Sequence, residues 1–517
     1  MMFRRFLLSA IAAGAIGFGA ATASAAPAKN VILFISDGAS WGTWDMASYW
    51  ATGVQRGQAY ADFPVKLGMT TYPLNTSNTP TGNMTPQVSY DPGRAWDTTF
   101  RGGTRPFDGY RYIHQNATDS AAAGTALATG QKTYNRAISW SNTNEPLERI
   151  TDVAKSHGKA TGIVTSVPFT HATPAVFGAQ TPRRDAYGEI ATQMLTNPNL
   201  DLIMGAGHPF HDVNGQRVAT PNYSWWQNPL GLGDPSFGPG TGASRFEALT
   251  GTGARFTFFD DLATFQGLAD GSITFDQPIF GLAPVRSTLQ YDRIGVSDPA
   301  NISVERGNAS GVPFNETVPT LVEMTAGAIN HLSRNPNGFF LMVEGGAVDW
   351  AAHANNTARI IEEQVDFDRA VAWAINWVET YSSWAETLMV VLTDHGNGMP
   401  MGPDSHTTPF QGIENRGRGV LPGVRWHSGS HTNENTLFWA KGEGSWLFYD
   451  HVVGIDRGLI DVLAFNDGRY IDNTAVYPVM LRAMSTHDVP EPASAALLLA
   501  GLAGLGLAVR RRQAVPA

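Results

Sequence analysis

The stretch NVILFISDGAS, residues 30–40, joins an apolar run to an acidic residue and a glycine. Residues 31–36 are almost continuously hydrophobic, which is typical of a strand buried on both faces of a parallel sheet. Asp37 follows directly, at the carboxyl end of that strand. Ligand sites in open parallel sheets gather at this edge. The stretch therefore predicts a central strand with Asp37 beside a functional site.

Two further stretches repeat this arrangement. In GFFLMVEGGAVDW, residues 338–350, Glu344 follows an apolar run, and in TLMVVLTDHGNG, residues 387–398, Asp394 and His395 follow another. One acid beside a glycine is ordinary turn chemistry, but three such strand ends in one chain are harder to explain in that way. We expect an α/β fold with a central, mostly parallel sheet, helices on both faces, and these side chains at one edge.

Composition limits the class of protein. The chain has 517 residues, is 43% hydrophobic and carries a formal net charge of −10. It is long enough to bury a large core in one or two domains. The acidic balance argues against nucleic-acid binding, and bound divalent cations would partly offset it. Because the chain has no cysteine, a metal would have to bind His, Asp, Glu and hydroxyl side chains.

Residues 1–25 have the pattern of a signal peptide. Arg4 and Arg5 precede an apolar run over residues 6–20, and small residues follow at 23–25. Cleavage near Ala25 would leave a catalytic domain over residues 26–488. We expect export to the periplasm, the cell envelope or the extracellular medium.

The carboxyl end, residues 489–517, begins with VPEP, continues with an apolar segment over about 493–509, and then has three arginines at 510–512. The apolar segment is expected to be a helix, short for a full span, with its basic end on the cytoplasmic side. The pattern resembles the PEP sorting signal of certain Gram-negative bacteria, which implies processing by an exosortase. A plain membrane anchor is the alternative.

The stretch NATDSAAAGTALATGQKTYN, residues 116–135, places Ser120 before a run of small residues. Thr118, Asp119 and Ser120 are all good N-cap types, and the alanine-rich run favours a helix. The N–H groups and the dipole at this helix end suit an oxyanion or a phosphate. Ser120 is therefore either a helix cap or a hydroxyl placed for chemistry.

Further candidate metal ligands follow the last two strands. Asp349 and His353 are four residues apart, and so share a face if the segment is helical; an exposed helix pair is the alternative. His431 is the preferred additional ligand, and His427 is the fallback. Together with Asp37, Glu344, Asp394 and His395 at the strand ends, these residues are too many ligands for one ion. Nitrogen and carboxylate ligands suit zinc, and surplus oxygens suit magnesium.

Five separated motifs, in order, resemble those of the bacterial alkaline phosphatases. They are DSA at 119–121, TGQKTYN at 129–135, EGGAVDWAAH at 344–353, DH at 394–395 and HT at 431–432. The resemblance covers about residues 29–444, with a divergent middle. It implies an alkaline-phosphatase-like fold, and it makes Ser120 the nucleophile that carries a phosphoserine intermediate.

The resemblance also implies two zinc ions and one magnesium ion. The implied ligands are Asp349, His353 and His431 for the first zinc; Asp37, Asp394 and His395 for the second; and Asp37, Glu344 and Thr173 for magnesium. The arginine that clamps phosphate is best matched by Arg184, with Arg183 as a competitor, because a guanidinium fork suits two phosphate oxygens.

The implied function is that of an exported phosphomonoesterase, which releases inorganic phosphate from phosphate monoesters with an alkaline optimum. The alternatives are a phosphodiesterase or sulfatase of the same superfamily, or a surface or matrix protein on this fold. Arg184, Glu344 and Thr173 favour monoesters, because a diester offers one fewer charged oxygen.

Two positions depart from part of the family, and one segment departs from the sheet-and-helix rhythm. Trp350 stands where some relatives carry lysine or histidine, and His171 where some carry aspartate. The first change removes a positive charge near the phosphate, and the second makes the third metal site less anionic.

Residues 205–313 are expected to form a loop-rich insertion that shapes substrate access or subunit contact, the latter in keeping with a homodimer.

Overall fold

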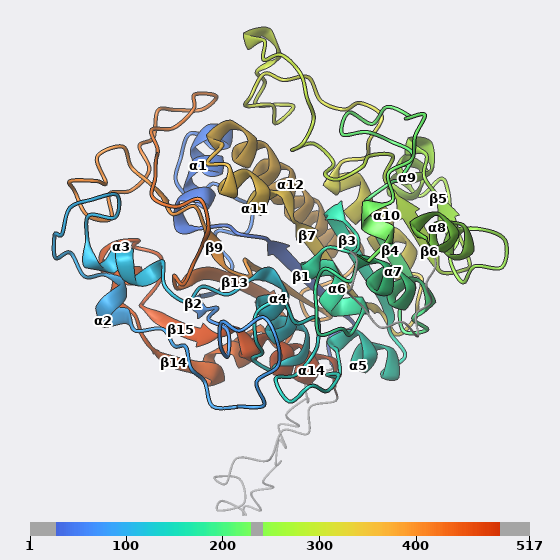
Figure 1. Cartoon of the computed structure of the whole chain (residues 1–517), viewed down its shortest axis with the longest axis horizontal. Coiled ribbons are helices and arrows are strands. Elements are labelled where there is room, and N and C mark those ends of the chain that lie inside the picture. The colour runs from blue at the N-terminus through green and yellow to red at the C-terminus, as the bar shows by residue number, and fades with distance from the viewer. Residues whose placement is uncertain (1–26, 229–240, 486–517) are drawn as a thin grey trace, which may run out of the picture. The chain divides into compact units, whose positions relative to one another are not determined.

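An 11-stranded sheet runs through the computed structural model, which describes residues 27–228 and 241–485 (Figure 1). From one edge to the other, its strands are β14 (Val452–Ile455), β15 (Arg469–Asp472), β2 (Val65–Thr70), β13 (Thr436–Gly442), β8 (Thr387–Leu392), β1 (Asn30–Ser36), β7 (Phe339–Gly345), β3 (Ala160–Pro168), β4 (Leu202–Ala206), β6 (Ile279–Leu282) and β5 (Thr257–Phe259). Two small antiparallel pairs lie outside it: β9 (Gly396–Asn397) with β12 (His431–Thr432), and β10 (Pro400–Met401) with β11 (Arg425–Trp426).

Strand β1 is at the centre and pairs in parallel with β7 and β8. Ile35 lies opposite Glu344 on one side and Leu392 on the other. Strand β3 pairs in parallel with β7, which places Thr165 opposite Glu344. The four strands thus run in one direction, and their carboxyl ends lie side by side at the same end of the sheet. The predicted α/β fold with a mostly parallel central sheet is confirmed.

Helices cover both faces of this sheet. On one face lie α1 (Trp41–Thr52), α9 (Leu262–Asp270), α10 (Leu321–Leu332) and α12 (Thr357–Tyr381); on the other lie α4 (Ser120–Thr129), α5 (Ile150–Ser156), α6 (Ala172–Gly178), α7 (Tyr187–Thr196) and α14 (Val476–Met484). The remaining α-helices of the described residues are α2 (Pro92–Ala95), α3 (Asp108–Ile113), α8 (Gly242–Thr250), α11 (Ala347–His353) and α13 (Arg457–Asp461).

The continuous apolar runs are explained by these two layers of helices. Alternate residues of β1 point to opposite faces, so Ile32 and Phe34 join one core cluster while Leu33 and Ile35 join the other. All seven residues of β1 are buried. A strand covered on both sides needs apolar residues at nearly every position, as the sequence has.

The segment 205–313 begins in the last residues of β4 and contains α8, α9, β5 and β6, together with two short 3-10 helices, η1 (Ser224–Trp226) and η3 (Pro299–Asn301). Strands β6 and β5 extend the sheet beyond β4 at one edge. The rest of the described part of this segment consists of turns and loops.

Both predicted sorting segments, residues 1–25 and 489–517, lie outside the described residues. Within residues 27–228 and 241–485, no helix combines the length and the apolar character needed to cross a membrane.

Candidate active site

Ser120 is the first residue of α4, and its side chain is buried at the edge where the central strands end. The cap of this helix is Asp119, whose Oδ1 accepts a hydrogen bond from the N–H of Ala122 at 3.0 Å. The Ser120 hydroxyl is therefore not used as the cap. The small residues after it allow close packing: a Cβ on Gly124 would lie 2.9 Å from Val176 of α6.

A set of three side chains, which we name the second set, surrounds the Ser120 hydroxyl: Asp37, Asp394 and His395. The His395 Nε2 atom lies 3.1 Å from Ser120 Oγ, 3.3 Å from Asp394 Oδ2 and 3.5 Å from Asp37 Oδ1. Ligand atoms of the second set all lie within 4.8 Å of one another. All three residues are completely buried at the ends of β1 and β8.

A neighbouring set, the first set, consists of Asp349, His353 and His431. The Nε2 atoms of the two histidines are 3.1 Å apart, and they lie 3.4 Å and 3.3 Å from the Asp349 carboxylate. The His431 ring stacks on the His395 ring, with centroids 3.7 Å apart, so the two sets are adjacent.

Backbone carbonyls orient both imidazoles of the first set. His353 Nδ1 lies 2.9 Å from the carbonyl of Gly429, and His431 Nδ1 lies 2.8 Å from that of Thr118. Because a carbonyl only accepts, each Nδ1 carries a proton, and the Nε2 atom of each ring is turned towards Asp349. Metal-binding histidines are oriented in this way, with one ring nitrogen bound to a carbonyl and the other directed at the ion.

The third set comprises Glu344, Thr173 and Asp37. Thr173 Oγ1 donates to Asp37 Oδ2 at 3.4 Å, and Glu344 Oε2 accepts a short hydrogen bond from the hydroxyl of Thr165. All these residues are fully buried. The structure thus brings together every predicted metal ligand, although they are spread over almost 400 residues of the sequence.

Three buried carboxylates in these sets each keep one oxygen without a hydrogen-bond partner. Burial, with repulsion from Asp394, raises the pKa of Asp37 well above its usual range. Burial also raises the pKa of Glu344 to about 8, and burial together with Asp349 raises that of Asp394 to about 7. Within the described residues, Asp37 Oδ1, Glu344 Oε1 and Asp394 Oδ2 have no hydrogen-bond partner. A divalent cation would restore the charged forms, so this donor set fits bound metal ions.

Asp349 behaves differently from the other carboxylates. Although burial raises its pKa, the adjacent His431 and His353 lower it well below the usual range. The same contact with Asp349 outweighs burial and raises the pKa of His431. These pKa shifts result from the close approach of one carboxylate and two imidazoles. A zinc ion bound to all three side chains would replace their direct contacts with metal coordination.

Arg184 is the cation of the site. Its Nη1 donates to Asp119 Oδ2 at 2.9 Å, and its Nη2 donates to His171 Nε2 at 3.3 Å. It lines a cavity of 420 Å³, which also has Ser120, His171, Tyr291, Asp349, Trp350, His353 and His431 in its wall. Arg183 is outside this lining and is 3.9 Å from Asp185. Of the two adjacent arginines, Arg184 is therefore the one that lines the cavity beside Ser120.

Two residues that support the ligands were not identified from the sequence. Asn397 donates from Nδ2 to Asp349 Oδ1 at 2.7 Å, and Thr165 holds Glu344 as described above. Asn397 lies just after the Asp394-His395 pair, which is the only sequence signal for it. His427, the fallback ligand, instead bonds Ser405 at 2.7 Å and does not line the cavity.

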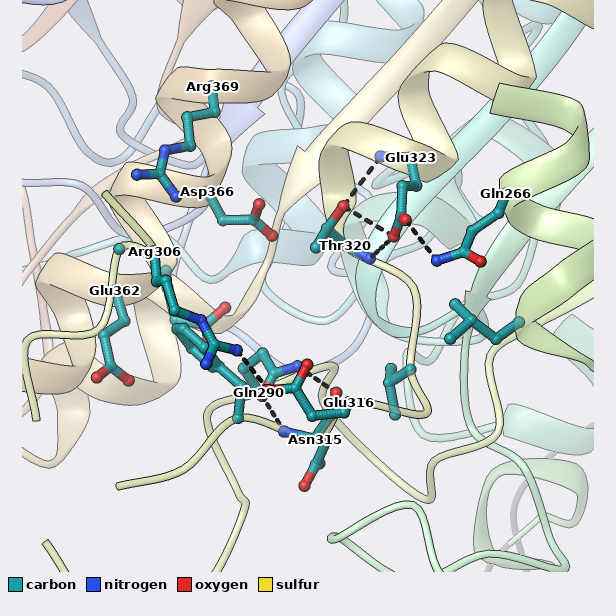
Figure 2. A pocket seen from close by; sticks show the side chains of 15 residues that line it. Gln266, Gln290, Arg306, Asn315, Glu316, Thr320, Glu323, Glu362, Asp366 and Arg369 are labelled. Carbon is teal, nitrogen blue, oxygen red and sulfur yellow. Dashed lines mark hydrogen bonds and ion pairs between the residues drawn. The ribbon is translucent and has the colours of Figure 1, made fainter. Parts of the chain in front are cut away.

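A second cavity, of 250 Å³, lies between α10, α12 and the segment 306–318 (Figure 2). It contains none of the predicted site residues. Acidic side chains of α12 line it, including Asp366, which accepts a hydrogen bond from the N–H of Leu321, and Glu363. Burial, with repulsion from Asp366, raises the pKa of Glu363 to about 8. We assign no chemistry to this cavity.

Comparison with known proteins identifies the family. The alkaline phosphatase family matches residues 28–222 and 298–419, which is more than half of the chain. The PEP-CTERM protein-sorting motif matches residues 488–512, which confirms the predicted sorting signal and indicates export through the cell envelope.

Curated relatives are similar over part of their length. The chain is 30% identical over 288 residues to alkaline phosphatase 4 of Bacillus subtilis, covering 55% of this chain and 50% of the relative. It is 31% identical over 299 residues to alkaline phosphatase H of Pseudomonas aeruginosa, covering 56% and 60%. The chain thus spans about half the length of the curated relatives it matches.

Solved structures share the fold. The alkaline phosphatase from the Antarctic bacterium TAB5 superposes with a TM-score of 0.56 at 22% identity, covering 89% of this chain and 100% of that one. The Thermus thermophilus alkaline phosphatase gives a TM-score of 0.55 at 20% identity, covering 89% and 92%. At such identities the likeness concerns the fold. With the family match over residues 28–222 and 298–419, it leads to one conclusion: the chain belongs to the alkaline phosphatase family.

Proposed function

We propose that this protein is an exported, metal-dependent phosphomonoesterase that releases inorganic phosphate through a phosphoserine intermediate on Ser120. The observation that carries this proposal is the position of the Ser120 hydroxyl, 3.1 Å from His395 Nε2 and in the wall of the same cavity as Arg184. A hydroxyl, a guanidinium and a converging set of metal ligands are what transfer of a phosphoryl group requires.

The first and second sets would each hold a zinc ion, and the third set would hold magnesium. A structure of a mutant TAB5 alkaline phosphatase has Mg bound in its M3 site, which supports magnesium as the third ion. When bound, such ions lower the pKa of a coordinated hydroxyl or water and neutralise charge on phosphate oxygens. Asn397 and the carbonyls of Thr118 and Gly429 would keep the first set oriented.

The residues of the chain have separable roles in this reaction. The Ser120 hydroxyl gives its proton to solvent, and its oxygen forms a bond to phosphorus while the bond from phosphorus to the alcohol oxygen breaks; the departing oxygen takes up a proton from solvent. The N–H groups at the start of α4 favour the negative charge on the oxygen. Arg184 would hold two non-bridging oxygens, and Asp119 keeps its guanidinium in place. Water then displaces phosphate from Ser120, which restores the hydroxyl.

We further propose that turnover rises towards alkaline pH, because more of the Ser120 hydroxyl and of the attacking water is then deprotonated. Phosphate monoesters are the proposed substrates. The proposed destination is the periplasm, the cell envelope or the extracellular medium, with processing at the sorting motif by an exosortase.

The test replaces Ser120 with alanine. In protein supplied with zinc and magnesium, Ser120→Ala should lower turnover of p-nitrophenyl phosphate by about 10³-fold or more, as expected when a covalent nucleophile is removed. Acid quenching of the wild type should leave a phosphoryl group on the peptide that contains Ser120, detected by mass spectrometry. Ser244→Ala, a serine in the first turn of α8, is the matched control and should keep full turnover.

Substrate comparison separates the alternatives. The bis(p-nitrophenyl) phosphate diester and p-nitrophenyl sulfate should react much more slowly than the monoester, because each carries one negative charge fewer for Arg184 and the third set to bind. Equal or faster turnover of the diester or the sulfate would contradict the monoesterase proposal. No turnover of any ester with both metals supplied would favour a matrix or adhesive role on the same fold.

A further inference from the structure

The cavity beside Ser120 has more than a phosphate site in its wall. Besides the proposed metal ligands His353 and His431, three of its lining residues carry flat rings: His171, Trp350 and Tyr291. His171 contacts the guanidinium of Arg184 at 3.3 Å, and its ring lies edge-on to Trp350, with centroids 5.7 Å apart. The aromatic part of the wall is therefore in direct contact with Arg184, the proposed phosphate clamp. A volume of 420 Å³ is within the range of small-ligand sites and leaves room for the alcohol part of a monoester.

A second layer of rings supports this wall. Trp225 of η1 packs against Trp350, with centroids 6.4 Å apart, and against His171 at 6.4 Å. The ring of Tyr187 lies edge-on to Trp225, with centroids 4.9 Å apart. Aromatic groups in contact with one another keep their rings at fixed angles, so the surface offered to a ligand is formed in advance.

Hydrogen bonds of flanking residues hold the segments that carry Tyr291 and Trp225. On one side of Tyr291, the N–H of Leu289 donates to Ser166 at the end of β3 (3.0 Å); on the other, Arg293 donates to the buried Glu362 at 2.8 Å. Trp225 is held by its neighbour Trp226, which is completely buried and donates to the carbonyl of Gly207 at 2.9 Å. Both rings thus belong to anchored segments.

The rings of Trp350 and Tyr291 add no charge to the cavity that they line. Indole is uncharged, and burial, with the nearby Asp292, raises the pKa of Tyr291, so its phenol stays neutral. Trp225 and Tyr291 also lie between the two ranges, 28–222 and 298–419, that match the family. The segment between those ranges thus contributes to the cavity wall in this chain.

We infer that this cavity prefers phosphomonoesters whose alcohol carries a flat aromatic ring, as nucleoside 5′-monophosphates do, and that Tyr291 and Trp350 bind that ring. Flat rings stack on aromatic side chains with little regard to their substituents. The inference rests on the proposed function, since it concerns the leaving group of that reaction. It assigns Tyr291 and Trp350 to specificity, whereas Ser120 and Arg184 act on phosphate.

The test compares adenosine 5′-monophosphate with ribose 5-phosphate, because both release the same primary ribose oxygen and differ in the base. In protein supplied with zinc and magnesium, kcat/KM should favour the nucleotide by about threefold to tenfold, the range for one or two aromatic contacts. Tyr291→Leu should reduce this ratio towards one, and Tyr291→Phe should retain it. Tyr381→Leu, at the exposed end of α12, is the matched control and should keep the wild-type ratio.

Binding gives a second readout that is independent of turnover. On a Ser120→Ala background, calorimetry should give a lower Kd for the nucleotide than for ribose 5-phosphate, and Tyr291→Leu should remove that difference. Hydrolysis of both esters with equal kcat/KM, or an unchanged ratio in Tyr291→Leu, would overturn this inference and leave the proposed function intact. Failure to hydrolyse any monoester would overturn both.

Discussion

Asp119 shows how one side chain serves both a helix and a site. One carboxylate oxygen caps α4 and accepts hydrogen bonds from the N–H groups of Ala122 and Arg136 at 3.0 and 2.9 Å, while the other accepts from Arg184. Burial alone would raise its pKa, but Arg184 and the backbone donors lower it, so the group stays charged. The helix that presents Ser120 and the arginine proposed to bind phosphate are thus held by the same residue.

Asp119→Asn tests this double role. The amide oxygen should keep the cap, because Asn and Asp are equivalent at this position, but the charge that holds Arg184 is lost. The inhibition constant of inorganic phosphate should rise about tenfold, which is about 1.4 kcal/mol and at the low end for a charged hydrogen bond. The unfolding temperature should change little. Competition kinetics measures the constant, and Asp261→Asn, at the cap of α9, is the control. A wild-type constant in Asp119→Asn would show that Arg184 needs no such partner.

At the scale of the element, the turn between β1 and α1 sets the distance between two metal sets. Gly38 adopts a φ of +70°, and a Cβ there would lie 2.7 Å from Asp349 Oδ1 and 2.9 Å from the Asp349 backbone. Its N–H also donates to Asp394 Oδ1 at 3.1 Å. A glycine is required because both the conformation and the close approach exclude a side chain.

Gly38→Ala should therefore displace Asp349. We expect zinc affinity and kcat/KM to fall by about tenfold to a hundredfold, the range for loss of a residue that orients metal ligands. Zinc per chain after dialysis, measured by elemental analysis, checks this expectation. Gly82→Ala is a control for backbone strain alone, because Gly82 has a φ of +75° with nothing within 4 Å of its Cβ position. Equal zinc content in the two variants would contradict the proposed clash.

Helix α12 carries a buried acid that makes stability depend on pH. The pKa of Glu363 is raised to about 8 in the folded protein, against an ordinary value of about 4.3 in the unfolded chain. The folded state then binds more protons than the unfolded state between these values. Stability contributed by this group is therefore present at low pH and lost as pH rises from about 5 to about 8.

Glu363→Gln should flatten that dependence. Chemical unfolding at several pH values should show the wild type losing up to about 1.4 kcal/mol per pH unit relative to the variant over this window. Glu379→Gln, an exposed position on the same helix, should follow the wild type. Parallel curves for wild type and Glu363→Gln would mean that a bound cation or another partner already compensates the carboxylate in its cavity (Figure 2).

At the scale of the whole molecule, the sheet gathers charge that the protein alone does not neutralise. Four buried acids meet here: Glu344 at the end of β7, Asp37 and Asp394 directly after β1 and β8, and Asp349 in helix α11. Burial and mutual repulsion raise the pKa values of Asp37, Glu344 and Asp394 and so disfavour their charged forms. Bound metal ions should then stabilise the whole fold by mass action, because the unfolded chain has no such site.

Metal removal should therefore lower stability and activity together. Dialysis against a chelator should lower the unfolding temperature by about 5 °C or more, and return of zinc and magnesium should restore both properties. Differential scanning calorimetry with parallel assays measures the change. The double variant Asp37→Asn, Asp394→Asn loses ligands of the second and third sets but keeps the first set, so the chelator should lower its unfolding temperature by less than that of the wild type. Identical melting of the wild type in both conditions would refute metal binding at these sets.

The sequence by itself determined the central strands, the acids at their ends and the motif around Ser120. A strand covered on both faces must be apolar throughout, and a ligand at its carboxyl end must interrupt that run, so β1, β7 and β8 are readable as local patterns. The sequence also pointed to the sorting motif, because short basic and apolar blocks carry that signal without any fold.

Tertiary structure alone decided which neighbours complete the site. Asn397 reaches Asp349, Thr165 reaches Glu344, and Tyr291 joins the wall beside Trp350 across long stretches of chain. Adjacent arginines look alike in sequence, yet only Arg184 lines the cavity. These contacts depend on the order of the strands and on the loops at their carboxyl ends. No local sequence pattern predicts them, since each depends on the packing of elements that are distant along the chain.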